Sequence, residues 1–255
     1  MLLAHETTGD GPDLVLVHGI TESRETWRPL VHMLGADHRI TLIDLRGHGA
    51  SPATGPYDPI TLATDLRETL SAALGERVDD AMIVGHSLGG VVVSAYAAMF
   101  PSRCVVNVDQ PLRLSSFKGA LAQLEPMLRG DEESFQAGIN VMFDSMYGAL
   151  PANEVDRLRS NRRATQQVVL GVWGTVFDST VEELDAQVDA IASGVTTRYL
   201  SLHGTDPGSE YELWFRSALP TAEYEAWDAL GHYPFLVDPQ RFADRVREFS
   251  GRSEK

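Results

Sequence analysis

The chain has little that could join it covalently and little positive charge. Only one cysteine, Cys104, occurs among its 255 residues, so neither an internal disulfide nor a paired-cysteine metal or redox site can form. Lys and Arg together number 21 against 36 Asp and Glu, which gives a net charge of −15. A chain with this charge repels phosphate backbones and anionic lipid headgroups. Neither nucleic acid nor a membrane surface is therefore expected as a partner.

Long hydrophobic runs are absent as well. The run from Val91 to Val93 is far shorter than the roughly 20 apolar residues that a membrane-spanning helix needs. The beginning of the chain contains neither a basic segment nor a sustained apolar one, so no secretory signal peptide is expected. Together with the single cysteine, these features favour a location in the cytoplasm.

The sequence does contain a regular alternation of short apolar runs with segments of helical periodicity. Short runs rich in Val, Ile and Leu are typical of strands that are buried on both faces of a sheet. Strands are expected at residues 14–17, 40–43, 82–84, 105–108, 198–202 and 222–227, with an additional edge strand at 2–6. Helices are expected at residues 27–34, 62–74, 88–100 and 239–249. This order predicts an α/β fold with a mostly parallel, doubly wound sheet.

The alternation stops after Val108. Between about residue 111 and residue 193 the sequence shows helical periodicity at 117–128, 132–146, 153–169 and 181–191, without a convincing strand. The chain is therefore expected to form a core domain of residues 1–110 and 195–255, with an all-helical cap of residues 111–194 inserted into it. No flexible linker precedes or follows this insert, so the cap should pack on the core.

The motif that indicates chemistry is Gly85-His86-Ser87-Leu88-Gly89, which connects an expected strand to an expected helix. A serine on so sharp a turn leaves no room for a Cβ two residues to either side, which explains the two glycines. The same turn places Ser87 at the start of a helix, where amide donors favour developing negative charge. Ser87 is the candidate nucleophile.

A serine hydroxyl needs a base, and the base needs an acid to orient it. His232 follows the strand expected at 222–227, and Asp206 follows the strand expected at 198–202, at the sheet edge where α/β folds gather functional loops. The order Ser87, Asp206, His232 is therefore the expected triad. Asp109, directly after the strand at 105–108, is the alternative acid. Two backbone amides, those of Ile20 and Leu88, are the expected oxyanion donors.

The chain resembles the α/β-hydrolase superfamily along almost its whole length. The matching pieces are His18-Gly19, Asp44-Leu45-Arg46-Gly47-His48-Gly49-Ala50-Ser51, Gly85-His86-Ser87-Leu88-Gly89-Gly90, His203-Gly204-Thr205-Asp206 and Gly231-His232. The resemblance implies a Ser87, Asp206 and His232 triad beneath a helical cap that is inserted after the sixth strand of that fold. The start of the chain is too short for the fold's usual opening hairpin, so one edge strand is expected to be missing.

The interpretation that these residues favour is hydrolysis of a carboxylic ester through an acyl-enzyme on Ser87. A lactonase, a carbon–carbon bond hydrolase or an acyltransferase would use the same triad, and a ligand-binding or inactive relative would keep the pocket without turnover. The expected partner is a small, apolar acyl or ester molecule, and no cofactor or metal is expected. The candidate pocket residues are His18 and His86 from the core and Met142, Phe143, Met146, Trp173 and Phe177 from the cap.

Overall fold

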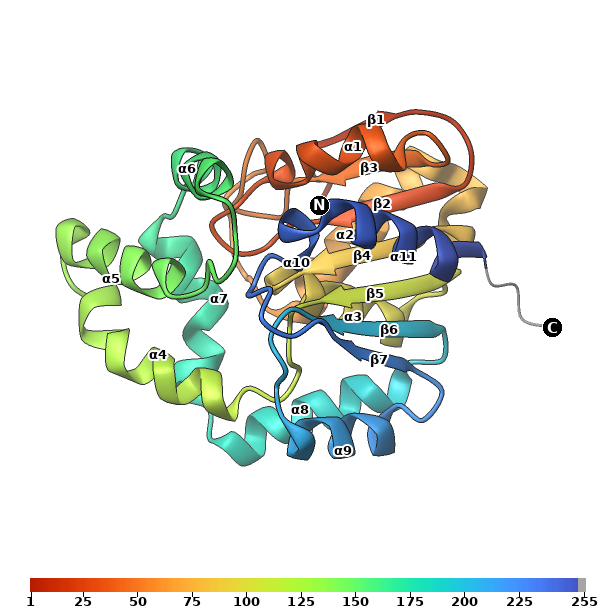
Figure 1. The fold of residues 1–255 in the computed structure, drawn as a ribbon. Coiled ribbons are helices and arrows are strands. Elements are labelled where there is room, and N and C mark those ends of the chain that lie inside the picture. Colours follow the sequence, from red (N-terminus) through yellow and green to blue (C-terminus); the bar gives the residue numbers. More distant parts are fainter. Residues whose placement is uncertain (252–255) are drawn as a thin grey trace.

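A computed structural model describes residues 1–251 and places a seven-stranded sheet at the centre of the molecule (Figure 1). The strand order is β1-β3-β2-β4-β5-β6-β7, in which β1 pairs antiparallel with β3 and every other pair is parallel. The strands are β1 His5–Thr8, β2 Asp13–Val17, β3 Arg39–Ile43, β4 Met82–His86, β5 Cys104–Val108, β6 Arg198–His203 and β7 Glu223–Ala226. The predicted doubly wound, mostly parallel sheet is confirmed, although its edge strand is β1 and lies later than the expected residues 2–6.

Helices cover both faces of this sheet (Figure 1). They are η1 Arg24–Trp27, α1 Arg28–Leu34, α2 Pro59–Leu74, η2 Gly75–Asp80, α3 Leu88–Met99, α9 Ser209–Ala218, α10 Pro234–Val237 and α11 Pro239–Gly251. Of these, α1 and α11 pack together on one face, and α2 and α3 pack together on the other. Asp58 begins α2 as an N-cap by accepting from the amide of Thr61 at 2.9 Å.

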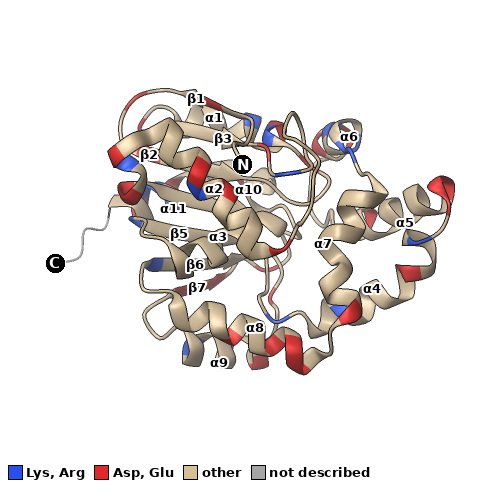
Figure 2. Cartoon of the chain, turned by 180° about the vertical axis from the view of Figure 1, so that it is seen from behind, with Lys and Arg blue, Asp and Glu red and all other residues tan. Residues whose placement is uncertain are grey.

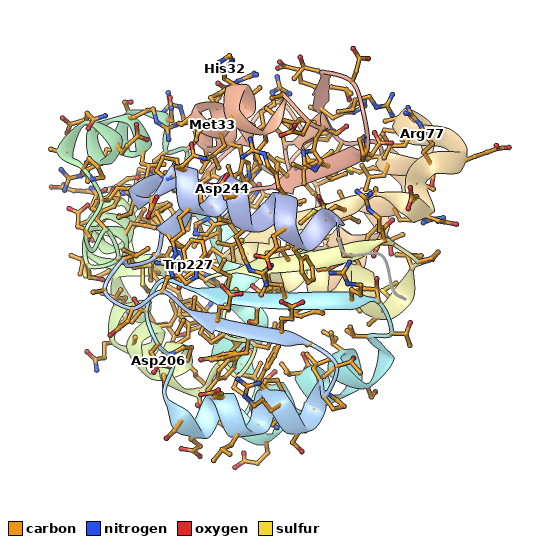
Figure 3. All side chains as sticks on the ribbon, turned by 45° about the vertical axis from the view of Figure 1, so that its right-hand side comes forward. His32, Met33, Arg77, Asp206, Trp227 and Asp244 are labelled. Carbon is orange, nitrogen blue, oxygen red and sulfur yellow. The ribbon has the colours of Figure 1, made fainter. Side chains whose placement is uncertain are left out.

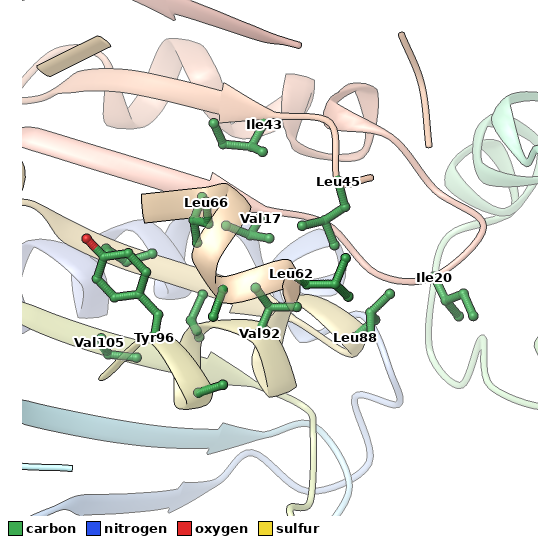
Figure 4. Close-up of a cluster of buried hydrophobic side chains, with 14 of the residues drawn as sticks. Val17, Ile20, Ile43, Leu45, Leu62, Leu66, Leu88, Val92, Tyr96 and Val105 are labelled. Carbon is green, nitrogen blue, oxygen red and sulfur yellow. The ribbon is translucent and has the colours of Figure 1, made fainter. Parts of the chain in front are cut away.

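The strands are buried on both faces, so alternate residues enter two different hydrophobic clusters. In β2, Leu14 and Leu16 pack in the cluster that contains Trp27, whereas Val15 and Val17 join the cluster under α2 and α3. Figure 4 shows the second of these clusters, which extends to the carboxyl end of the sheet. The core therefore supports the loops that follow the strands.

The segment between β5 and β6 is all-helical. It consists of α4 Ser115–Leu128, α5 Glu132–Asp144, α6 Ala152–Asn161, α7 Gln166–Asp178 and α8 Val181–Gly194. Helices α4 to α7 lie beyond the carboxyl ends of the strands, and we call these four helices the cap (Figure 1). Helix α8, which was expected in the cap, instead packs against α3 and α9 beside the sheet.

The prediction of a single helix at residues 153–169 is wrong, because two helices, α6 and α7, occupy this region. Arg162 has an extended backbone, with φ −60° and ψ 130°, and separates α6 from α7. The next amide, that of Arg163, donates to the carbonyl of Thr21 at 2.9 Å. A bond to the core thus replaces the helical bond that periodicity alone would favour.

Charged residues are distributed over the cap and the helical layers, and acidic residues are prominent on α8 (Figure 2). Within residues 1–251, no helix has the length and apolar character needed to cross a membrane.

Candidate active site

Ser87 lies in a strained turn between β4 and α3. Its φ of 53° and ψ of −120° fall where a residue with a Cβ is rarely found. The turn is held by the Ser87 amide, which donates to the carbonyl of Val108 at 3.0 Å. A Cβ on Gly85 would lie 2.1 Å from the carbonyl oxygen of Gly89, and one on Gly89 would lie 2.4 Å from that of Val17. Both glycines are therefore sterically required, as the motif predicts.

His232 is paired with Asp109. The distance from His232 Nδ1 to Asp109 Oδ2 is 2.6 Å, and Asp109 Oδ1 accepts from the amide of Gly204 at 2.7 Å. A carboxylate only accepts, so Nδ1 carries the proton and Nε2 is left as the free base. Burial alone would raise the pKa of Asp109, but the contact with His232 and the Gly204 amide hold this pKa below its usual value.

The expectation that Asp206 orients His232 is wrong. Asp206 is exposed and accepts from the amide of Gly208 at 2.9 Å and from the hydroxyl of Tyr224 at 3.3 Å, close to the start of α9 (Figure 3). Asp109 directly follows Val108 at the end of β5, whereas Asp206 lies three residues beyond β6. The additional residues carry its carboxylate away from the histidine.

The two expected oxyanion donors lie at the same end of the core cluster (Figure 4). Leu88 is the first residue of α3, so its amide has no partner within the helix. Among residues 1–251, neither this amide nor that of Ile20 donates a hydrogen bond to another protein group. Two unused amides are thus available in the turns that contain Ser87 and Gly19.

A cavity of about 730 Å³ opens over these groups. Ser87, Asp109 and His232 line it together with Ile20 and Leu88. Of the pocket residues expected from the sequence, those that line the cavity are Met142, Phe143, Met146 and Trp173. Phe177 does not line it and instead has the Arg129 guanidinium 5.0 Å from its ring centre.

His18 and His86, also expected at the pocket, are fully buried behind its wall. The Leu45 amide donates to His18 Nε2 at 3.0 Å, so the Nδ1 proton is the one that His18 donates to the carbonyl of Gly19 at 2.7 Å. Burial also lowers the pKa of His18, which keeps its ring neutral. His18 therefore shapes the turn that leads to Ile20.

Comparison with known proteins identifies the family. The model of the alpha/beta hydrolase family matches residues 14–245. The chain belongs to this family. The pimeloyl-[acyl-carrier protein] methyl ester esterase of Edwardsiella ictaluri is 29% identical over 262 residues, which cover 97% of each chain. The solved structure of esterase RhEst1 from Rhodococcus sp. ECU1013 has a TM-score of 0.70 at 25% identity and covers 96% of this chain and 93% of that one.

A further esterase structure, that of EaEST from Exiguobacterium antarcticum, shares the fold. Its TM-score is 0.77 at 17% identity, and the alignment covers 98% of this chain and 96% of that chain. In the part of this hydrolase that the structure describes, no group of three or more His, Cys, Asp or Glu residues is arranged to hold a metal ion.

An ion-pair network that the sequence analysis missed contributes Arg113, Asp185 and Trp214 to the lining of the hydrolase cavity. The Arg113 guanidinium pairs with Asp185 and, at 2.8 Å, with Asp189, and it lies 4.6 Å from the centre of the Trp214 ring. Trp214 Nε1 also donates to Asp189 at 3.0 Å. These residues come from α8, α9 and the loop after β5, and no motif connects them in the sequence.

The cap region of the hydrolase contacts the loop that carries His232. The amide of His232 donates to the carbonyl of Met146 at 3.1 Å. At Gly231, the residue before His232, the two loops come closer still: a Cβ on Gly148 would lie 2.7 Å from the Cα of Gly231. The backbones of the two loops therefore touch, and glycine is required where they meet.

Proposed function

We propose that this hydrolase is a serine esterase in which Ser87 is the nucleophile, His232 the general base and Asp109 the residue that orients the base. One observation carries the proposal: a histidine paired with a buried carboxylate opens onto the same cavity as a serine on a strained, glycine-flanked turn. The relatives named as esterases support ester bonds as the target.

In the first half of the reaction, His232 Nε2 takes the proton of Ser87 as its Oγ attacks the ester carbonyl carbon. The carbonyl electron pair moves to oxygen, and the amides of Ile20 and Leu88 donate to this oxyanion. As the oxyanion collapses, the bond to the alkoxy group breaks and His232 returns the proton to the departing alcohol. An acyl-enzyme on Ser87 remains. Asp109 stabilises the intermediate imidazolium without taking its proton.

In the second half, the same histidine removes a proton from water, which attacks the acyl carbon. The second tetrahedral intermediate collapses when Ser87 leaves with the proton that His232 holds. The products are the carboxylic acid and the regenerated serine. The buried, strained turn keeps Ser87 in one orientation through both halves, so no reorganisation is needed between them.

The lining of the cavity favours an apolar substrate. Side chains such as Met142, Phe143 and Trp173 line the cavity and offer dispersion contacts without a formal charge. We therefore propose a small, apolar ester as the substrate of this esterase. As a separate proposal, we place the protein in the cytoplasm.

The first test replaces the nucleophile. Ser87→Ala should lower ester turnover at least about 10³-fold while the fold is retained, because no hydroxyl is left to form the acyl-enzyme. Turnover is measured on a panel of esters, lactones and diketones, and a fluorophosphonate is used to label the serine. Ser116→Ala changes another cavity-lining serine and is the matched control.

The wild-type protein and the control should hydrolyse esters and be labelled, and Ser87→Ala should do neither. Ester turnover that persists in Ser87→Ala would contradict the mechanism. Selective turnover of lactones or diketones by the wild type would keep the triad and replace the proposed substrate class.

A further inference from the structure

Glu22 is a buried carboxylate that the mechanism above does not use. It lies in the loop after β2 and is only 8% exposed. Transferring a charged carboxylate from water into a protein interior is costly unless it is paired and hydrogen-bonded. The contacts of Glu22 show what this charge is paired with.

The first contact is with the loop that provides an oxyanion donor. The amide of Gly19 donates to Glu22 Oε2 at 3.1 Å. Gly19 precedes Ile20, and a Cβ added at Gly19 would lie 3.1 Å from the Cβ of Ser87. Glu22 therefore fixes the backbone directly before the Ile20 amide, where that backbone packs against the nucleophile.

The second contact is with His86, the residue before Ser87. His86 Nε2 lies 2.8 Å from the carbonyl oxygen of His232, and a carbonyl only accepts, so Nε2 carries a proton. His86 Nδ1 lies 3.6 Å from Glu22 Oε2 and makes no hydrogen bond with residues 1–251. The Glu22 carboxylate is thus a charged group that faces this buried ring nitrogen.

The surroundings of Glu22 favour its ionised form. Burial alone would raise the pKa of Glu22, but the contact with His86 and the hydrogen bond from Gly19 lower it to about 2. Four titratable side chains face Glu22 from different elements: His18 from the end of β2, His48 from the loop after β3, His86 from β4 and Tyr233 before α10. His86 also faces His232, with ring centres 4.6 Å apart.

We propose that Glu22 is a positioning residue of the esterase: its carboxylate holds the Ile20 loop through the Gly19 amide and, through the ring of His86 that bonds to the His232 carbonyl, the loop that carries His232. Nucleophile, oxyanion donor and base come from loops after three different strands, and Glu22 joins all three. The inference rests on the proposed function, since it assigns these loops to one reaction.

Two substitutions separate the contacts. Glu22→Ala removes both of them, whereas Glu22→Gln keeps an oxygen that can accept from Gly19 and removes the charge that faces His86. We expect kcat for ester hydrolysis to fall about 10- to 100-fold in the alanine variant and about 3- to 10-fold in the glutamine variant. KM should change less than about 3-fold in both, because Glu22 does not line the cavity.

The rates are divided by the number of active sites, which a fluorophosphonate burst counts. Glu25→Gln is the control, since Glu25 lies on the same segment but its side chain is 45% exposed. It should retain kcat within about 2-fold, as expected for an exposed ion pair. If kcat per titrated site is unchanged in Glu22→Ala, Glu22 has only a structural role and the proposal is overturned.

A second measurement does not require a substrate or a stable alanine variant. Nitrogen NMR of the His86 ring should give the same Nδ1 signal in the wild type and in Glu25→Gln, and a shifted Nδ1 signal in Glu22→Gln, because only the latter variant changes the group that faces this nitrogen. An Nδ1 signal that is the same in Glu22→Gln as in the wild type would overturn the link through His86. Failure of the proposed function is a separate result, in which the wild-type protein neither turns over esters nor is labelled at Ser87.

Discussion

The turns that follow β5 and β6 each contain an aspartate, and only one of them meets the base. Asp109 is buried, has a φ of 49°, and uses both carboxylate oxygens, one on His232 and one on the amide of Gly204. Asp206 is exposed and bonds to Gly208 and Tyr224. The strained backbone and the buried, fully bonded carboxylate of Asp109 are features of a functional group, whereas the bonds of Asp206 are those of a turn.

The comparison also assigns a role to the motif around Asp206. Its glycine, Gly204, donates to Asp109 and has no room for a side chain, because a Cβ there would lie 2.1 Å from the carbonyl oxygen of Gly231. The segment after β6 thus supports the acid of the neighbouring strand and does not provide one. A family motif can be retained for its backbone while its carboxylate has another partner.

The largest effect is expected for Asp109→Asn. The new amide nitrogen can donate to His232 Nδ1, which would place the ring proton on Nε2 and remove the base. Ester turnover should fall about 10³- to 10⁴-fold, measured as kcat/KM with the fold checked by circular dichroism. A loss smaller than about 10-fold would remove Asp109 from the proposed triad.

A smaller effect is expected at His203, which lies between the two aspartates at the end of β6. Burial lowers the pKa of His203 to about 4, although Asp109 and Asp206 both act to raise it. Below pH 6.5 the unfolded chain gains a proton at this residue that the folded chain does not bind, so stability falls as pH falls from 6.5 toward 4. At pH 5 the loss from this residue is about 2 kcal/mol.

Urea unfolding of the wild type and of His203→Asn at pH 7 and pH 5 measures this loss. The variant should be less stable at both pH values because the smaller side chain leaves space in the core. The quantity compared is therefore the change in unfolding free energy between pH 7 and pH 5 in each protein. That difference should be about 2 kcal/mol smaller in the variant than in the wild type. Equal differences in the two proteins would show that His203 is not held neutral.

The smallest effect is expected for Asp206→Asn, the counterpart of the first substitution. The side chain is exposed and the asparagine oxygen can still accept from the amide of Gly208. Turnover should stay within about 3-fold of the wild type and stability within about 0.5 kcal/mol. A loss of the size expected for Asp109→Asn would restore Asp206 to the triad and reverse the comparison.

Local patterns in the sequence were sufficient to predict most of the fold. Buried strands such as β2 and β5 appear as mostly apolar runs, and the glycines around Ser87 follow from steric limits within one turn. The division between α6 and α7 could not be predicted in this way. It depends on the bond from Arg163 to Thr21, which joins residues that are distant in the sequence.

The candidate site could likewise be predicted only where it depends on local sequence. Ser87 and His232 could be chosen because each has a motif around it, but the acid depends on how two neighbouring turns leave the sheet. One signal was present in the sequence. Val108 is the last residue of β5 and pairs with Leu202 of β6, so Asp109 comes directly after a paired strand residue, whereas Asp206 comes several residues later. Glu22 and Arg113 gave no signal, because their partners come from other elements.

The bond between the cap and the base loop has a consequence for engineering. The carbonyl of Met146 accepts from the amide of His232, and Gly148 touches Gly231, so the proposed base takes part of its support from the segment between α5 and α6. A chimera that takes its lid from another esterase must keep residues 146–148 with their host, or acquire the donor's base loop as well. Otherwise new specificity would come with a misplaced imidazole.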